Sequence, residues 1–262
     1  MSPLQPRGHR FVVARMGSTG SAWLAKLLNS HPDVFCSHEG VAARAYPARS
    51  YGPVDILRFL DWLAWDTMHG AYTAVGDVGS VWQSHAVALS EFQTAVLVRH
   101  PARLLSTRLA TYAYDQPFIE IETDADVRSV WDIDMATCEP LDRIFLHDLF
   151  IFASQIWAAE RGVRFIRIED MSDTAHCLLE LKHLTGVDYD PGLVDEAIRM
   201  RVNQRVPPMP IPQIVASFTP QQREWYRLIL GDAAARLGYD LNCDTCWPAY
   251  SDSRRRQCAT TN

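Results

Sequence analysis

Residues 11–39 (FVVARMGSTGSAWLAKLLNSHPDVFCSHE) constrain the fold of this chain more than any other stretch. Phe11–Ala14 predicts a short buried strand, residues 17–21 are all Gly, Ser or Thr, and apolar residues then recur at helical spacing from Ala22 onward. The free N–H groups of such a loop and the dipole of the following helix attract an anion. The two glycines allow close approach of the backbone and a positive φ. The stretch therefore predicts a phosphate-binding strand–loop–helix unit.

The loop differs from the phosphate loop of ATP- and GTP-binding enzymes. That loop has the pattern G-x-x-x-x-G-K-[ST], whereas here Gly20 is followed by Ser21 and Ala22. The missing lysine normally balances the charge of the β- and γ-phosphates. Its absence argues against a nucleoside triphosphate as the substrate, and an ordinary strand–helix turn without a ligand remains an alternative.

The loop and helix resemble the 5′-phosphosulfate loop of the sulfotransferases that use 3′-phosphoadenosine 5′-phosphosulfate (PAPS). In that family an R/K-x-G-[ST]-[ST]-W-L loop runs into a helix ending L-L-x-x-H-P, which residues 20–24 (GSAWL) and 27–32 (LLNSHP) match. The family's basic loop residue falls on Ser18, and the nearest cation is Arg15, so either Arg15 reaches back or the charge comes from elsewhere. The resemblance implies that the donor is bound by Arg15, Gly17, Ser18, Thr19, Gly20, Ser21, Ala22 and Trp23.

The segment after this helix supplies the candidate base. Val34–Cys36 predicts a second strand, and residues 31–39 resemble the H-P-x-V-x-C-G-E-E segment of the tyrosylprotein sulfotransferases, whose second glutamate is the catalytic base. The resemblance places that role on Glu39. A carboxylate in a partly dry cleft has a pKa raised toward the range useful for taking the acceptor's proton. His38 has a suitable pKa without tuning and is the alternative, and both residues could also be plain surface residues.

A second candidate phosphate site follows a predicted strand at 94–98. The family's 3′-phosphate motif is an apolar strand, then R-[DNH]-[PG], then a serine eight residues after the arginine. Here residues 99–101 read RHP, and the eighth position is Thr107, with Ser106 beside it. A guanidinium and a hydroxyl can together clamp a phosphate dianion. The resemblance therefore places Arg99 and Thr107 or Ser106 on the 3′-phosphate, and an arginine that only caps the sheet edge is the alternative.

The repeated strand–helix pattern predicts the fold class. Strands at 73–79, 94–98 and 163–168, together with the first unit, imply a parallel sheet with right-handed crossovers. Ligands of such sheets bind at the carboxyl ends of the strands. The resemblance implies an α/β protein with three α/β/α layers around a mostly parallel sheet, the P-loop NTPase-like sulfotransferase fold.

The resemblance spans about residues 10–240 and implies a single sulfotransferase domain over 1–242. Residues 109–150 are expected to be an insertion that covers the acceptor, and a helix is expected over 149–161. From Asp115 to Asp142 the chain holds nine acidic side chains against one arginine. Such a run is either a solvated face or a surface that selects a cationic acceptor. Residues 243–262 are expected to be a polar tail.

Composition narrows the class of partner. The net charge of −6 argues against a nucleic-acid binder. No apolar run of about 18 residues occurs, and residues 1–10 lack the apolar block of a signal peptide, which predicts a soluble cytoplasmic protein with no membrane association. Lys26 and Lys182 are the only lysines, an arginine bias that suggests a GC-rich bacterial source and leaves cationic roles to Arg or His. Cys243, Cys246 and Cys258 have spacing that a metal site could use, but ordinary thiols and no metal are expected.

Together these features predict a PAPS-dependent sulfotransferase that modifies a hydroxyl or amine of a small molecule, such as a natural product, and releases 3′-phosphoadenosine 5′-phosphate (PAP). The catalytic residues would be Glu39, His38 and Arg15. Arg205, which precedes a Pro-rich loop at 207–212, is a further candidate contact to the nucleotide. Two alternatives stay open: a P-loop kinase or NTPase, and a nucleotide-binding scaffold without catalysis.

Overall fold

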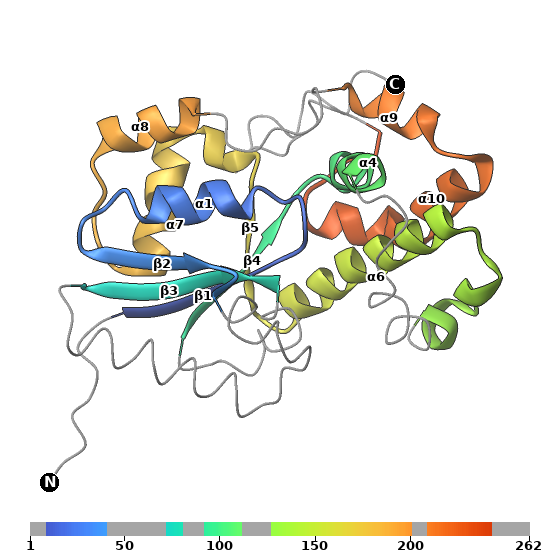
Figure 1. Cartoon of the computed structure of the whole chain (residues 1–262), viewed down its shortest axis with the longest axis horizontal. Helices are drawn as coiled ribbons and strands as arrows, with labels where there is room; N and C mark the ends of the chain where they lie inside the picture. Colours follow the sequence, from blue (N-terminus) through green and yellow to red (C-terminus); the bar gives the residue numbers. More distant parts are fainter. Residues whose placement is uncertain (1–8, 41–71, 81–91, 112–126, 201–208, 243–262) are drawn as a thin grey trace, which may run out of the picture. The chain divides into compact units, whose positions relative to one another are not determined.

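The computed structural model describes residues 9–40, 72–80, 92–111, 127–200 and 209–242. Strands and helices alternate through much of this part of the chain, as expected for an α/β protein (Figure 1). The described elements are, in chain order, β1 (His9–Arg15), α1 (Ser21–Leu28), β2 (Val34–His38), β3 (Ala74–Gly79), β4 (Gln93–Val98), α4 (Pro101–Thr111), η3 (Met135–Thr137), α6 (Pro140–Glu160), β5 (Arg164–Arg167), η4 (Asp170–Ser172), α7 (Thr174–Thr185), α8 (Pro191–Arg199), α9 (Ile211–Ser217) and α10 (Pro220–Arg236).

The five strands form one parallel sheet in the order β2-β3-β1-β4-β5. β1 lies in the centre, with β3 on one side and β4 on the other. From β1 the chain runs first to β2 at one edge of the sheet and then back to β3, which lies beside β1. It then crosses to β4 and β5 on the other side of β1. The strand order therefore reverses next to β1, where ligands of open parallel sheets bind beyond the carboxyl ends of the strands.

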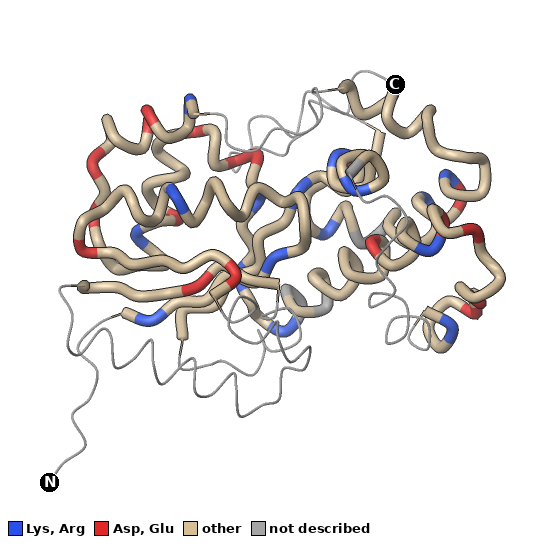
Figure 2. The backbone as a smooth tube through the Cα atoms, in the orientation of Figure 1, with Lys and Arg blue, Asp and Glu red and all other residues tan. Residues whose placement is uncertain are grey.

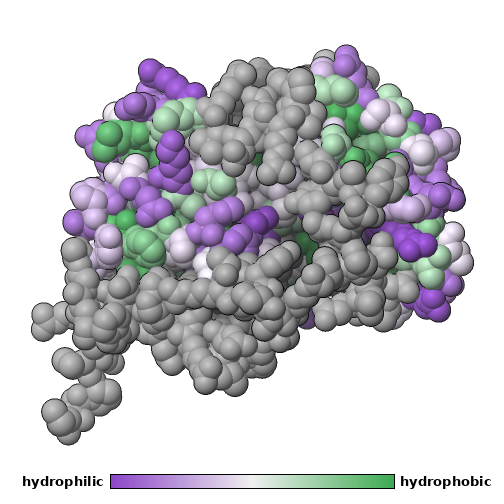
Figure 3. Space-filling model, in the orientation of Figure 1, coloured by the Kyte–Doolittle hydropathy of each residue, from purple (hydrophilic) through white to green (hydrophobic). Residues whose placement is uncertain are grey.

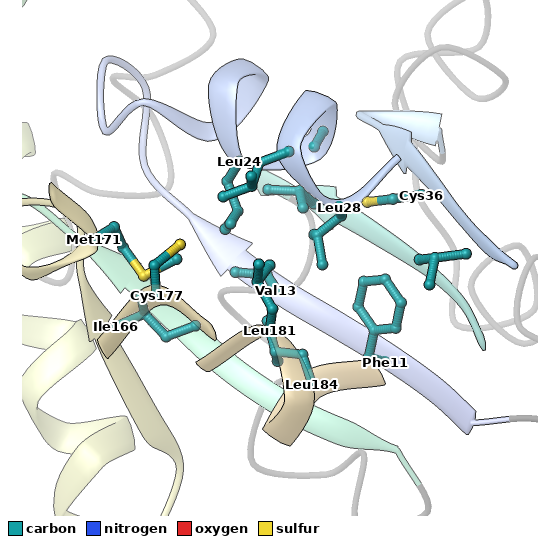
Figure 4. Close-up of a cluster of buried hydrophobic side chains, with 14 of the residues drawn as sticks. Phe11, Val13, Leu24, Leu28, Cys36, Ile166, Met171, Cys177, Leu181 and Leu184 are labelled. Atoms are coloured by element: carbon teal, nitrogen blue, oxygen red, sulfur yellow. The ribbon is translucent and has the colours of Figure 1, made fainter. Parts of the chain in front are cut away.

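One face of the sheet packs against α1, α7 and α8. Phe11 and Val13 of β1 point into this core, where they meet Leu24 of α1 and Leu181 of α7 (Figure 4). Gly76 of β3 makes room for the ring, because a Cβ atom there would lie 2.3 Å from Phe11. Apolar residues at helical spacing on α1 and α7 thus fold onto alternating apolar residues of the strands.

The opposite face of the sheet is also buried. Val12, Val75 and Val96 point away from the α1 core and are at most 2% exposed, so this face is covered as well. A sheet buried on both faces requires strands of nearly continuous apolar residues, which the sequence supplies. The predicted three-layer α/β/α fold around a parallel sheet is confirmed.

The chain groups into two compact units, residues 1–99 with 158–204 and residues 100–157 with 205–262. The first unit holds the sheet with α1, α7 and α8, and the second holds α4, α9, α10 and most of α6. In the second unit Arg108 of α4 donates from Nε to Oδ2 of Asp148 on α6 at 2.7 Å, and both side chains are buried.

The strands predicted from apolar runs all form. The helix expected over 149–161 instead begins at Pro140, so the end of the expected insertion at 109–150 is the first half of α6. Pro212, expected in a loop, lies in the first turn of α9, where a missing N–H costs nothing. Residues 112–126, 201–208 and the tail 243–262 lie outside the described residues, and the single-domain organisation stays a prediction.

The surface of the first unit mixes hydrophilic and hydrophobic side chains in the view of Figure 3. Among the described residues of this unit, the exposed large hydrophobic ones are single positions on or next to α7 and α8, namely Leu179, Leu193 and Met200. Among the helices that the structure describes, α6 is the longest, with 21 residues, and none is both long and apolar enough to cross a membrane.

Candidate active site at the carboxyl edge of the sheet

The loop between β1 and α1 is braced from two sides. The fully buried hydroxyl of Thr19 donates to the Met16 carbonyl at 2.8 Å, which closes the turn on itself. Arg99, directly after β4, donates from Nη1 to the Ser18 carbonyl at 2.8 Å. The side chain of Thr19 is therefore occupied in holding the loop, and the structure brings Arg99, predicted from a separate motif, against this loop.

Positive φ values occur at two loop positions, Ser18 with φ 66° and Gly20 with φ 90°. The prediction that Gly17 and Gly20 would serve this purpose holds for Gly20 alone, because Gly17 is not left-handed. A Cβ atom at Gly20 would also lie 3.0 Å from Ile168, which follows β5. Gly20 is thus required both by its backbone conformation and by a close neighbour.

α1 begins at Ser21, directly after the loop. Gly20 provides no side-chain cap, and the first turn contains no acidic residue. The first N–H groups of a helix have no partner within the helix, so they and the helix dipole favour an anion here. The side chain of Trp23 is engaged elsewhere. Its indole N–H donates to the Ala197 carbonyl at 2.9 Å, and its ring packs against the core.

Glu39 and Arg15, predicted from separate motifs, form an ion pair at this edge of the sheet, where acidic and basic positions lie close together (Figure 2). The Glu39 N–H extends the β2–β3 ladder by donating to the Val78 carbonyl at 3.0 Å. Oε1 of the same residue accepts from the Ser80 N–H at 3.0 Å, and Oε2 accepts from the Ser80 hydroxyl at 3.0 Å. Both oxygens of the candidate base are therefore held.

Arg15 carries an unused donor. Its Nε is buried and has no hydrogen-bond partner among the residues that the structure describes, while its Nη2 pairs with Glu39. Buried donors are nearly always satisfied in folded proteins, so an orphan of this kind calls for an explanation. Because Arg15 ends β1 and directly precedes the loop, an anion bound at the loop is a fitting partner.

His38 lies beside the start of α1, with its Nε2 3.0 Å from the Ser21 hydroxyl. Partial burial of the ring lowers the pKa of His38 below its ordinary value of 6.5, the positive charge of Arg15 lowers it further, and Glu39 opposes both. His38 is therefore neutral at neutral pH and shares a hydrogen bond with the Ser21 hydroxyl. It is within reach of the loop but is already engaged there.

Two residues of β3 and its end support this arrangement without having been predicted. Asp77 is fully buried and accepts from the Ser37 hydroxyl at 2.5 Å and from the Gly40 N–H at 2.9 Å. Ser80 holds the Glu39 carboxylate. An acidic residue inside the otherwise apolar AVGDVG strand was the signal for Asp77, whereas nothing local marks Ser80.

The remaining candidates for the 3′-phosphate lie on α4, in the second unit, and the boundary between the units falls directly after Arg99. Ser106 and Thr107 are half-buried, and the Thr107 hydroxyl donates back to the Arg103 carbonyl at 2.9 Å. Arg205 lies outside the described residues. The pairing of Arg99 with these hydroxyls stays a prediction.

The start of α4 is closed by its own side chain. Nδ1 of His100 accepts from the Ala102 N–H at 3.2 Å, so its Nε2 carries the proton and donates to the Asp240 carbonyl at 2.9 Å. The ring is 1% exposed and stacks edge-on against Tyr239. His100 is thus a buried cap of α4.

Within the described part of the chain, no group of three or more His, Cys, Asp or Glu side chains is arranged to hold a metal ion. Cys36 and Cys177 are free thiols inside the core, and burial raises the pKa of Cys177 to about 12, which makes it a poor nucleophile. The three C-terminal cysteines lie outside the described residues.

No protein-family model and no curated protein matches the chain. Among solved structures, the chain is similar to a sulfotransferase from Alicyclobacillus acidocaldarius, with 15% sequence identity and a TM-score of 0.43 over 93% of this chain and 99% of that one.

Proposed function

We propose that the protein is a sulfotransferase that moves the sulfuryl group of PAPS to a hydroxyl or amine of a small-molecule acceptor. The observation that carries the proposal is the meeting of three groups at the carboxyl edge of the sheet. These are an uncapped helix start, the Arg15 guanidinium with a buried unused donor, and the Glu39 carboxylate. An anion site next to a proton acceptor is what sulfuryl transfer requires.

The donor binds through its 5′-phosphosulfate at the loop. The N–H groups of residues 17–22 surround the anion, and Arg15 adds a full positive charge through Nε. As the bond between sulfur and the phosphate oxygen breaks, PAP leaves with the electron pair, and negative charge grows on that oxygen. Fixed donors aimed at this charge stabilise the transition state without reorganising. No metal takes part in this step.

The acceptor loses its proton to Glu39 as its oxygen or nitrogen attacks sulfur. In the structure the Glu39 carboxylate is paired with Arg15. An anion bound at the loop would attract the Arg15 guanidinium away from this carboxylate. One carboxylate oxygen then becomes available while Ser80 still holds the side chain. His38 is the alternative proton acceptor, since it is neutral at neutral pH and lies at the same edge.

The far phosphate of PAPS is assigned to Arg99, helped by Thr107 or Ser106, with Arg205 as a further contact. This assignment depends on the resemblance of the RHP motif. The Arg99 contact to the Ser18 carbonyl supports a position close to the donor but not the choice of phosphate. The acidic run from Asp115 to Asp142 would favour an acceptor that carries a positive charge.

Thermal denaturation tests the proposal first. PAP at about 100 times its Kd should stabilise the protein by about 2.7 kcal/mol, which corresponds to a rise in Tm of roughly 5–11 °C for a chain of this size. ATP with and without Mg²⁺ is the matched control and should stabilise less. A larger shift with Mg²⁺ and ATP would indicate a kinase or NTPase instead.

Turnover is measured next with radiolabelled PAPS against a library of phenols, alcohols and amines, with charged and neutral members in each class. Transfer of label to at least one acceptor is the expected result. Stabilisation by PAP without transfer to any acceptor would indicate a nucleotide-binding scaffold.

A further inference from the structure

The end of β3 reaches across to the candidate base with three groups in succession. The Val78 carbonyl accepts the Glu39 N–H at 3.0 Å, and the Ser80 N–H lies 3.0 and 3.2 Å from the two carboxylate oxygens. The Ser80 hydroxyl adds a third donor contact at 3.0 Å. One residue thus holds both oxygens of Glu39, and hydrogen bonds to a charged group are the stronger kind.

The backbone of Glu39 is held in an unusual conformation. Its φ is 57°, in the left-handed region that residues other than glycine rarely adopt. The Ser37 hydroxyl, near the end of β2, and the Gly40 N–H, just after Glu39, both donate to Oδ1 of Asp77. A fully buried carboxylate in the middle of a strand is unfavourable unless it is hydrogen-bonded, and Asp77 is bonded to the turn that carries Glu39.

We infer that Ser80 and Asp77 are positioning residues that fix the Glu39 carboxylate at the edge of the sheet, Ser80 through the carboxylate oxygens and Asp77 through the turn at 37–40. This inference rests on the proposed function for its catalytic meaning, but the contacts can be tested without any substrate. Strained backbone conformations are kept where the surrounding structure enforces them, often at functional sites.

The substrate-free test uses protein labelled with ¹³C at the glutamate carboxyl, with the Glu39 signal assigned by its loss in Glu39→Gln. Ser80→Ala should move this signal, and Ser80→Thr, which keeps the hydroxyl, should leave it close to that of the wild type. Ser172→Ala is the matched control, because Ser172 is also exposed and its hydroxyl donates to the Glu169 carbonyl, away from Glu39. An unchanged Glu39 signal in Ser80→Ala would overturn the inference.

The kinetic test uses the acceptor found in the library screen. Ser80→Ala should lower kcat by about 10-fold, with the KM for PAPS and the Kd for PAP unchanged, and Ser80→Thr should restore kcat. Asp77→Asn keeps one acceptor oxygen and should lower kcat without unfolding the protein. Loss of PAP binding in Ser80→Ala, or no change in kcat, would contradict a positioning role. If the Glu39 signal moves in Ser80→Ala while the wild type neither binds PAP nor transfers label, the positioning of Glu39 by Ser80 is confirmed and the proposed function is wrong.

Discussion

Two strand–helix junctions of this chain look alike in sequence and differ in structure. β1 ends at Arg15 and β4 is followed at once by Arg99, and each arginine precedes a helix. At the first junction a loop of small residues leads to α1, whose start has no side-chain cap. At the second, α4 begins almost directly at Pro101, and His100 caps the Ala102 N–H.

The difference shows what makes a helix start an anion site. Pro101 has no N–H, and the Ala102 N–H is already taken by the His100 ring, so α4 keeps fewer donors for a ligand than α1 does. An arginine at a strand end is present in both cases and decides nothing by itself. We therefore expect α1 to bind the donor through its backbone, and the second junction to contribute through the Arg99 side chain.

The largest expected effect is at Glu39, which pairs with Arg15 of the first junction. Glu39→Gln keeps the size of the side chain and its ability to accept hydrogen bonds but cannot take a proton at neutral pH. General-base catalysis contributes about 10²–10⁴-fold, so kcat should fall by at least about 10²-fold while the Kd for PAP stays the same. His38→Asn should cost much less. An inactive His38→Asn beside a working Glu39→Gln would assign the base to His38.

The next effect separates the roles of the two arginines. Arg99→Ala should raise the Kd for PAP by about 10-fold or more, since a hydrogen bond to a charged group is typically worth about 1.5–3 kcal/mol. Adenosine 5′-monophosphate, which lacks the 3′-phosphate, is the matched ligand and should bind equally well to both proteins. Equal losses for both ligands would instead assign Arg99 to the loop, where it contacts the Ser18 carbonyl.

A smaller effect concerns the backbone of the loop. Gly20→Ala should lower the free energy of unfolding by about 1–2 kcal/mol because a φ of 90° is strained for alanine. The close approach of Ile168 at 3.0 Å adds to this cost. Calorimetry should show a Tm lower by about 2–4 °C per kcal/mol, together with weaker PAP binding.

The matched change at the second junction is His100→Ala. Loss of a helix cap costs about 1 kcal/mol, so Tm should fall by a few degrees on the same scale. PAP affinity should not change, because α4 is not expected to offer backbone donors to the ligand. A loss of PAP binding in a folded His100→Ala protein would show that the second junction binds an anion after all.

The sequence predicted the strands of the fold because each is an apolar run next to polar or small residues, and this local pattern determines a buried strand. It did not predict the start of α6, where the polar residues Asp142, Arg143 and Asp148 obscure the helical pattern. Asp148 is buried there, and Arg108, forty residues earlier, pairs with it. Such a partner cannot be seen in a local window.

The candidate site shows the same limit. Arg15, Glu39 and Arg99 each stood out in a local motif, and the structure brings the first two into contact. Ser80 did not stand out, because its importance comes only from the register that places the end of β3 beside Glu39. The left-handed φ of Ser18 was also missed, since Gly17 next to it is the residue type that usually takes that conformation.

The smallest effect concerns His38, whose ring lies beside the start of α1 at the first junction. Burial, and then Arg15, lowers the pKa of His38, whereas Glu39 raises it. The unfolded chain therefore binds a proton more readily than the folded one, so His38 lowers the stability as pH falls from 6.5 to its folded pKa, and the loss is constant below that. His38→Asn removes this penalty. Urea titrations between pH 5 and 7.5 should show the stability of His38→Asn gaining on that of the wild type as the pH falls, by a small amount because the ring is partly exposed. A difference in stability that does not vary with pH would mean that the pKa of His38 is the same in the folded and the unfolded chain.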